Sequence, residues 1–187
     1  MIPRLTDETM EFRAPKSMSP EELGDTLAQL VWESFSDFIA DGDADTLLGE
    51  LGLTTDDGVP KEAAAEEMLI FLMWAHTRGM QLAFVGRATD DLIKEGLDEL
   101  HKAVFEDMVN HGTPRSQLPI FEQRVSARYT EYYSASGQSD TSVGAAVVGH
   151  LTGRADQSAP LAWALTERAI EVANPLRDFL EDVDLTH

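Results

Sequence analysis

The sequence contains no cysteine. Disulfide bonds, thiol nucleophiles and thiolate metal ligands are therefore excluded. A chain without disulfides is typical of a reducing compartment, so we expect a cytoplasmic location. Long hydrophobic runs are missing too, since the longest one covers residues 68–75. A membrane-spanning helix needs about 20 apolar residues, so we expect a soluble protein that does not bind membranes.

Positive charge is scarce in this chain. There are 14 lysines and arginines against 34 aspartates and glutamates, which gives a formal net charge of −20. Such a chain repels phosphate backbones, so we expect no nucleic-acid partner. Arginine also outnumbers lysine. Two explanations remain open: a surface suited to concentrated salt, as in a halophile, or an ordinary acidic protein from a GC-rich genome.

The common catalytic and phosphate-binding motifs are absent. The chain has no Gly-x-Ser-x-Gly, no Gly-x-x-x-x-Gly-Lys-Ser/Thr and no His-Glu-x-x-His. Residues 144–149 begin and end with glycine but lack the lysine of a phosphate loop. The sequence therefore predicts no cofactor, and we interpret these small residues as a site of close helix packing.

Helical periodicity dominates, and no convincing pair of strands is visible. We expect an all-α protein: a single bundle of about six helices around a central apolar helix at about 60–85. Residues 1–18 form an N-terminal arm in this prediction, and residues 19–187 form one all-helical domain. Two domains joined near residues 112–114 are the alternative.

Local signals place the helix ends. Ser19 and Glu22 have the spacing of a capping box, which starts a helix that ends near residue 41. Pro175 should kink or split the last helix. The other predicted helices cover 44–51, 60–85, 89–111, 116–135, 141–151 and 158 onward, the last with an apolar stripe that includes Phe179.

Four polar side chains are predicted to lie on apolar helix faces: His76, His101, Arg128 and Tyr132. In one interpretation, each histidine bonds a backbone carbonyl or a carboxylate, and Arg128 forms an internal salt bridge. In the other, the four side chains line one interior pocket that binds a small ligand. A second line on the long helix predicts a polar seam against a neighbouring helix. It contains Glu67, Trp74, Arg78 and Val85, and Glu66, Thr77 and Gln81 lie nearby.

Metal sites are poorly supported by the sequence. Asp41, Asp43 and Asp45 resemble the start of a calcium loop, but Thr46 and Gly52 stand where that loop needs glycine and glutamate. A dinuclear site lacks its Glu-x-x-His motifs. A single metal held by both predicted buried histidines and a carboxylate is geometrically feasible. We nevertheless expect no bound metal.

Two apolar pairs lie away from the main stripes of their helices. Trp32 and Ile39 are seven residues apart near the N-terminus, and Trp163 and Ile170 repeat this spacing near the C-terminus. Such pairs can build a second packing layer or an interface. The sequence therefore favours a non-enzymatic module that binds a protein partner or itself, most simply as a homodimer. The alternative is a bundle with an interior pocket for a small ligand or a single metal, or an enzyme built on such a pocket.

Overall fold

The computed structural model describes residues 16–40, 47–139, 141–153 and 159–187. Within these ranges the protein is a bundle of helices with one very small sheet, so the predicted all-α fold is confirmed. The elements are β1 (Lys16–Met18), α1 (Pro20–Ala40), α2 (Glu62–Phe84), α3 (Asp90–Asn110), η2 (Arg115–Gln117), α4 (Leu118–Ser136), α5 (Ser142–Thr152), α6 (Ala159–Leu180) and β2 (Val183–Leu185).

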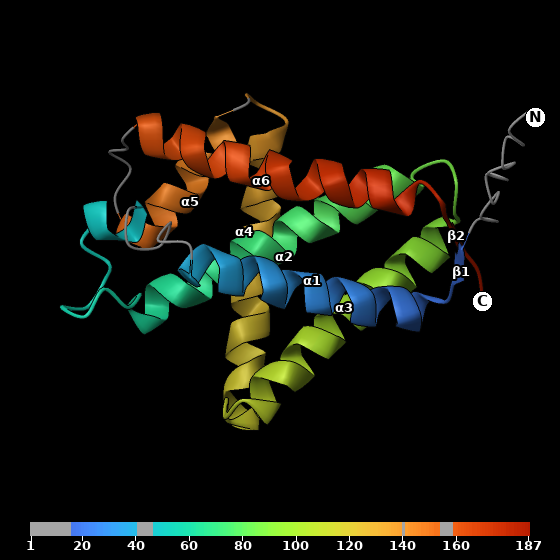
Figure 1. The fold of residues 1–187 in the computed structure, drawn as a ribbon, viewed down its shortest axis with the longest axis horizontal. Helices are drawn as coiled ribbons and strands as arrows, with labels where there is room; N and C mark the ends of the chain where they lie inside the picture. Colours follow the sequence, from blue (N-terminus) through green and yellow to red (C-terminus); the bar gives the residue numbers. More distant parts are fainter. Residues whose placement is uncertain (1–15, 41–46, 140, 154–158) are drawn as a thin grey trace, which may run out of the picture.

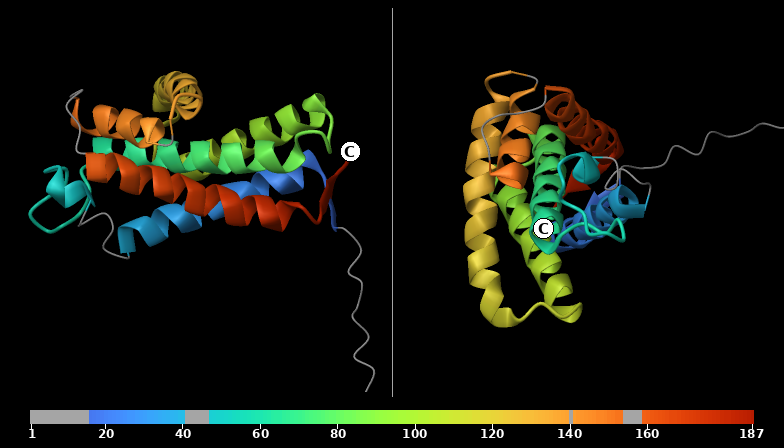
Figure 2. Two further views of the ribbon diagram at one scale, coloured as in Figure 1. Left: turned by 90° about the horizontal axis from the view of Figure 1, so that it is seen from above. Right: turned by 90° about the vertical axis from the view of Figure 1, so that its left-hand side faces the viewer.

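The helices are arranged around α2. Helix α1 packs mainly against α3, while α6 packs against both α2 and α5. Helices α1, α2 and α6 extend along the long axis of the molecule (Figure 1). Helix α4 crosses them steeply and is seen nearly end-on from above (Figure 2). Side chains on different sides of α2 therefore face different neighbours.

The central apolar helix is confirmed. Ile70, Phe71, Leu72 and Met73 are all fully buried, although four consecutive residues point in every direction around a helix. A helix that is apolar all round is stable only when other helices cover every side. The stretch 68–75 thus sets α2 at the centre.

The predicted capping box starts α1. The Ser19 backbone N–H donates to the Glu22 carboxylate at 2.9 Å, and the Glu22 N–H donates to the Ser19 hydroxyl at 3.2 Å. Thr89 caps α3 in a similar way by accepting a bond from the Leu92 N–H at 3.3 Å. The other helix ends lie within a few residues of their predicted positions.

The sequence shows no convincing pair of strands, but the structure contains one. Strand β1 pairs in parallel with β2, with Lys16 opposite Val183 and Met18 opposite Leu185. Each strand has only three residues, too few to show an alternating pattern, and the two lie near opposite ends of the sequence. The last residues of the predicted arm are therefore fixed to the C-terminal segment.

Arg87 fastens this sheet to the end of α2. Its guanidinium donates to four carbonyl oxygens, those of Ala83, Leu180, Glu181 and Val183, at 2.8–3.1 Å. These acceptors include carbonyls at the C-terminal end of α6, where unpaired carbonyls carry partial negative charge. One arginine thus joins α2, α6 and β2.

Three further expectations concern single segments. Helix α6 runs through Pro175 as one element, so the expected split does not occur. Phe179 is 51 % exposed, because it lies at the edge of the apolar stripe and not at its centre. Residues 47–50 of the predicted short helix are helical, whereas its beginning lies outside the described residues.

Candidate functional site

His76 is buried near the middle of α2. Its side chain is held by a bond in which Nδ1 donates to the Leu72 carbonyl at 2.7 Å. Nε2 is therefore the acceptor and lies 3.5 Å from the Ser34 hydroxyl of α1. Burial lowers the pKa of His76, and the bond to Leu72 opposes this effect only in part. The ring lines a cavity of about 430 Å³ between α1 and α6, which we call the His76 cavity.

His101 faces a different part of the molecule. Its Nδ1 donates to the Leu97 carbonyl at 2.5 Å, and its Nε2 accepts from the Tyr129 hydroxyl of α4 at 2.9 Å. Burial lowers the pKa of His101 and raises that of Tyr129. His101 lines a separate hollow between α3 and α4. The structure therefore gives each histidine a backbone partner and does not bring the two together in either cavity.

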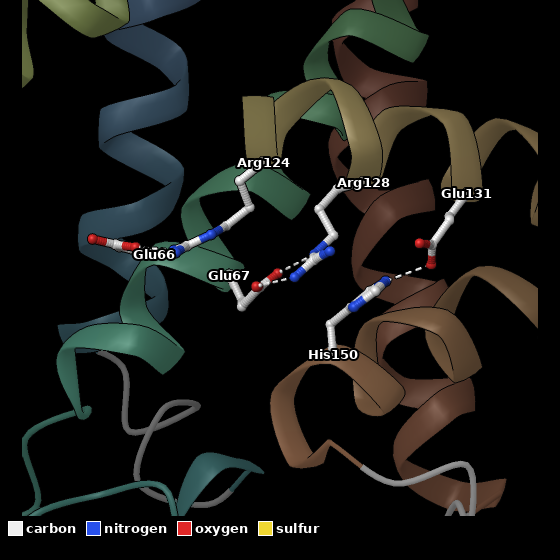
Figure 3. A network of polar contacts seen from close by, with 6 residues as sticks. All are labelled: Glu66, Glu67, Arg124, Arg128, Glu131 and His150. Atoms are coloured by element: carbon white, nitrogen blue, oxygen red, sulfur yellow. Dashed lines mark hydrogen bonds and ion pairs between the residues drawn. The ribbon is translucent and has the colours of Figure 1, made fainter. Parts of the chain in front are cut away.

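Arg128 forms the predicted internal salt bridge. Its Nε and Nη2 donate to the two Glu67 carboxylate oxygens at 2.9 and 2.7 Å (Figure 3). Tyr132 lies one turn further along α4, fully buried, and burial together with the charge of Glu67 raises its pKa. The Tyr132 hydroxyl has no hydrogen-bond partner among the described residues. Arg128 and Tyr132 thus lie together beside Glu67, whereas His76 and His101 have other hydrogen-bond partners.

The polar seam predicted on the long helix is present, and its partner is α4. Besides the pair just described, Arg124 pairs with Glu66, and the Tyr133 hydroxyl donates to the Gln81 side chain at 2.6 Å. Helix α5 joins the same network, because His150 lies 2.5 Å from Glu131 of α4 (Figure 3). The facing sides of α4 and α2 both carry polar groups, and the two helices can pack together because these groups bond to each other.

The chemistry of the His76 cavity favours binding over acyl transfer. Ser34 and His76 are residue types that serve as nucleophile and base in acyl transfer. The distance from the Ser34 hydroxyl to Nε2 of His76 is, however, at the limit of a hydrogen bond. Both residues lie inside helices, where the neighbouring backbone N–H groups are used in helical bonds and are not available to stabilise an oxyanion.

Metal binding has no support in the described ranges. No group of three or more histidines, aspartates and glutamates in these ranges is close enough to hold an ion. The candidate calcium loop at Asp41, Asp43 and Asp45 lies outside the described residues.

A third cavity was not anticipated as a site. We call it the Arg78 cavity; it measures about 200 Å³ and lies between α2 and α6 beside the turn from α4 to α5. Each of the two helices lines the cavity with residues four positions apart. Those of α2 are Trp74, Arg78 and Leu82, and those of α6 are Thr166, Ile170 and Asn174. The sequence placed Trp74 and Arg78 in the polar seam. It could not show that both also line this cavity against α6, while the Trp74 ring packs edge-on against Tyr132 and Tyr133 of α4.

The four predicted interface residues differ in exposure. Trp163, Ile170 and Ile39 are 49 %, 48 % and 39 % exposed. Trp32 is half-buried, because its indole N–H donates to Asp107 of α3 at 3.0 Å and its ring contacts Phe35 edge-on. Trp32 thus holds α1 against α3 within the chain, whereas the α6 pair is left exposed.

Comparison with protein-family models, with curated proteins and with solved structures finds no match to this chain. In the described part of the chain, no helix is both long enough and apolar enough to cross a membrane. The functional argument therefore depends on the geometry of this structure.

Proposed function

We propose that the chain is a non-enzymatic binding module that associates with a second copy of itself through one face of α6. The observation that carries this proposal is the half-exposed pair Trp163 and Ile170. Two turns of helix separate them, so they lie on one line of α6. Leu82 of α2, 38 % exposed, lies across the Arg78 cavity from Ile170 and extends the apolar surface.

A second copy is a suitable partner for this surface. Two α6 helices that pack antiparallel would place Trp163 of each copy beside Ile170 of the other, the arrangement of a symmetric dimer. Exposed aromatic side chains are frequent anchors at the centres of interfaces. The net charge of −20 on each copy opposes this association, so salt should strengthen it.

Sedimentation equilibrium tests the proposal. We expect a monomer–dimer equilibrium that shifts toward the dimer between about 0.1 and about 1 M KCl. Ile170→Glu should give a monomer, because it introduces a charge at the centre of the interface. Ile120→Glu is the matched control, since Ile120 is 64 % exposed on α4. A monomer at every concentration, or equal dissociation in both variants, would contradict the proposal.

The His76 cavity supports a second candidate, binding of a small amphipathic amine. Its wall presents the acceptor Nε2 of His76 and two carboxylates, Asp37 and Glu171, of which Glu171 lies 3.9 Å from Arg168 in the same wall. Leu30 and Val172 are apolar neighbours. These groups suit a ligand that donates hydrogen bonds and carries an apolar chain. Calorimetric titration with hexylamine tests this candidate: binding should weaken in Asp37→Asn and persist in the exposed control Asp56→Asn.

A cytoplasmic location belongs to the same proposal. It is supported by the absence of cysteine, which is typical of proteins in reducing compartments. The acidic composition supports a salt-rich cytoplasm, because a dense carboxylate coat is least costly where salt screens it.

A further inference from the structure

We infer that the Arg78 cavity binds a small monocarboxylate with a short apolar tail. This inference goes beyond self-association and does not depend on it, because it concerns a cavity inside one copy. It is based on the charge of the cavity wall, on an arginine that has no partner among the described residues, and on the division of the wall into polar and apolar parts.

Among the described residues, the wall of the Arg78 cavity carries a positive charge and no carboxylate. None of its described lining residues is an aspartate or glutamate, although the chain has 34 of them. Four other cavities of the described part each have at least one: Glu171 in the His76 cavity, Asp98 in the His101 hollow, Glu131 between α4 and α5, and Glu50 beside α6. The Arg78 cavity thus differs from the other four in having an arginine and no carboxylate among its described lining residues.

Arg78 has no ion pair and no hydrogen bond among the described residues. By contrast, Arg124 and Arg128 each pair with a glutamate of α2. The charge of Arg78 nevertheless acts on Tyr133. Burial raises the pKa of Tyr133 and the charge of Arg78 lowers it, and the pKa that results is about 12. Arg78 is half-buried, and a bound anion would pair with its guanidinium.

Trp74 supplies a second unused donor. Its side chain is 3 % exposed, and its Nε1–H has no hydrogen-bond partner within the described ranges. Trp74 and Arg78 are one helical turn apart on the same wall of the cavity. A carboxylate has two oxygens with several acceptor positions, so it has the capacity to accept from Arg78 and, once the indole ring shifts to expose its enclosed N–H, from Trp74.

The rest of the wall selects the tail and the size of the ligand. Val143, Ala169 and Ala173 supply apolar surface, and Leu82 and Ile170 stand half-exposed beside them. The volume of about 200 Å³ accommodates a chain of a few carbons. The negative field of the whole protein penalises a doubly charged phosphate more than a singly charged carboxylate. Together these features favour a monocarboxylate such as hexanoate.

Isothermal titration calorimetry on the whole chain tests the inference, with hexanoate as the probe and hexan-1-ol as its neutral counterpart. Hexanoate should bind at least about tenfold more tightly, because a hydrogen bond to a charged group is worth that much. Affinity should rise about fourfold per methylene from butanoate to hexanoate. Equal binding of the alcohol and the acid would overturn the inference.

Variants separate the site from the general charge of the protein. Arg78→Gln should weaken hexanoate binding at least about tenfold, while Arg78→Lys should retain part of it. Arg115→Gln makes the same charge change at an exposed position and should leave binding unaltered. Circular dichroism confirms that each variant is folded. Unchanged affinity in Arg78→Gln, or an equal loss in Arg115→Gln, would overturn the inference.

Tryptophan fluorescence locates the bound acid. In the double variant Trp32→Phe, Trp163→Phe, the remaining signal comes from Trp74 at the cavity wall. Hexanoate should change this signal in parallel with the calorimetric binding curve, and no change at saturation would place the acid elsewhere. An acetylated tetrapeptide ending in leucine, with free or amidated C-terminus, distinguishes the source of the carboxylate. Tighter binding of the free peptide than of hexanoate would exclude a small acid as the natural ligand.

Binding and self-association can fail independently. Trp163→Glu removes the proposed dimer face at a residue that does not line the Arg78 cavity, and its monomer can still be titrated with hexanoate. One pair of results would overturn the inference: Arg78→Gln fails to dimerise, and the unmodified chain does not bind hexanoate. Arg78 would then serve the interface and not a ligand.

Discussion

Gly144 of α5 lies directly against the backbone of Ala162 in α6. A Cβ at position 144 would overlap the Ala162 carbonyl oxygen and would also crowd the Thr166 hydroxyl. The same hydroxyl accepts a bond from the Gly144 N–H at 3.1 Å and donates to the Ala162 carbonyl at 2.9 Å. The close packing predicted from the small residues of 144–149 is therefore confirmed, with α6 as the partner.

Replacing Gly144 by alanine should destabilise the protein by about 3 kcal/mol, because neither backbone can move away without separating α5 from α6. Gly137→Ala is the matched control, since the nearest atom to its Cβ would be 3.6 Å away and its φ is −84°. Urea unfolding followed by circular dichroism measures both free energies. Equal stability of the two variants would show that the contact is looser than described.

Removing Glu67 should cost about 3 kcal/mol of stability, because Arg128 would lose its carboxylate in a largely buried place. The Glu67 and Arg128 side chains are 9 % and 20 % exposed, whereas those of Glu66 and Arg124 are 34 % and 35 % exposed. Glu66→Gln should therefore cost less than about 1 kcal/mol. Urea unfolding of Glu67→Gln and Glu66→Gln compares the two pairs, and a similar cost for both would contradict this ranking.

Stability should fall as the pH drops below about 6.5, partly because of His76 and His101. Burial lowers the pKa of both in the folded state, so the unfolded chain binds protons that the folded chain refuses. Each buried, neutral histidine contributes its full share of the free energy of unfolding above the pKa of a histidine in the unfolded chain. This contribution falls on acidification by up to about 1.4 kcal/mol per pH unit for each group.

Unfolding free energies between pH 7.5 and pH 5 test this effect in His76→Gln. The variant should show a shallower pH dependence than the unmodified chain, and the exposed control His187→Gln should keep the original slope. A parallel shift of the whole curve in His76→Gln would show a structural role without titration.

Potassium chloride should raise the melting temperature. Screening weakens the self-repulsion of a chain with net charge −20, and a gain of about 1 kcal/mol corresponds to about 3 °C at this length. Differential scanning calorimetry from low salt to molar KCl measures the effect at a protein concentration low enough to keep the monomer. A flat response would favour the ordinary acidic protein over the salt-adapted one.

The sequence alone determined the helices and the centre of the bundle. The capping box at Ser19, the cap at Thr89 and the apolar run 68–75 act through neighbouring residues, so their effects can be deduced from spacing. The buried position of His76 and the need of Arg128 for a partner also follow from their helix faces.

Only the tertiary structure decided which residues meet. Helical periodicity gives the direction of a side chain but not the helix opposite, so it could not separate His76, which faces α1 and α6, from His101, which faces α4. For the same reason it could not show that Arg128 finds Glu67 while Arg78 finds no carboxylate among the described residues. Strand β1 needs a partner from the far end of the chain, and local pattern carries no information on such a pairing.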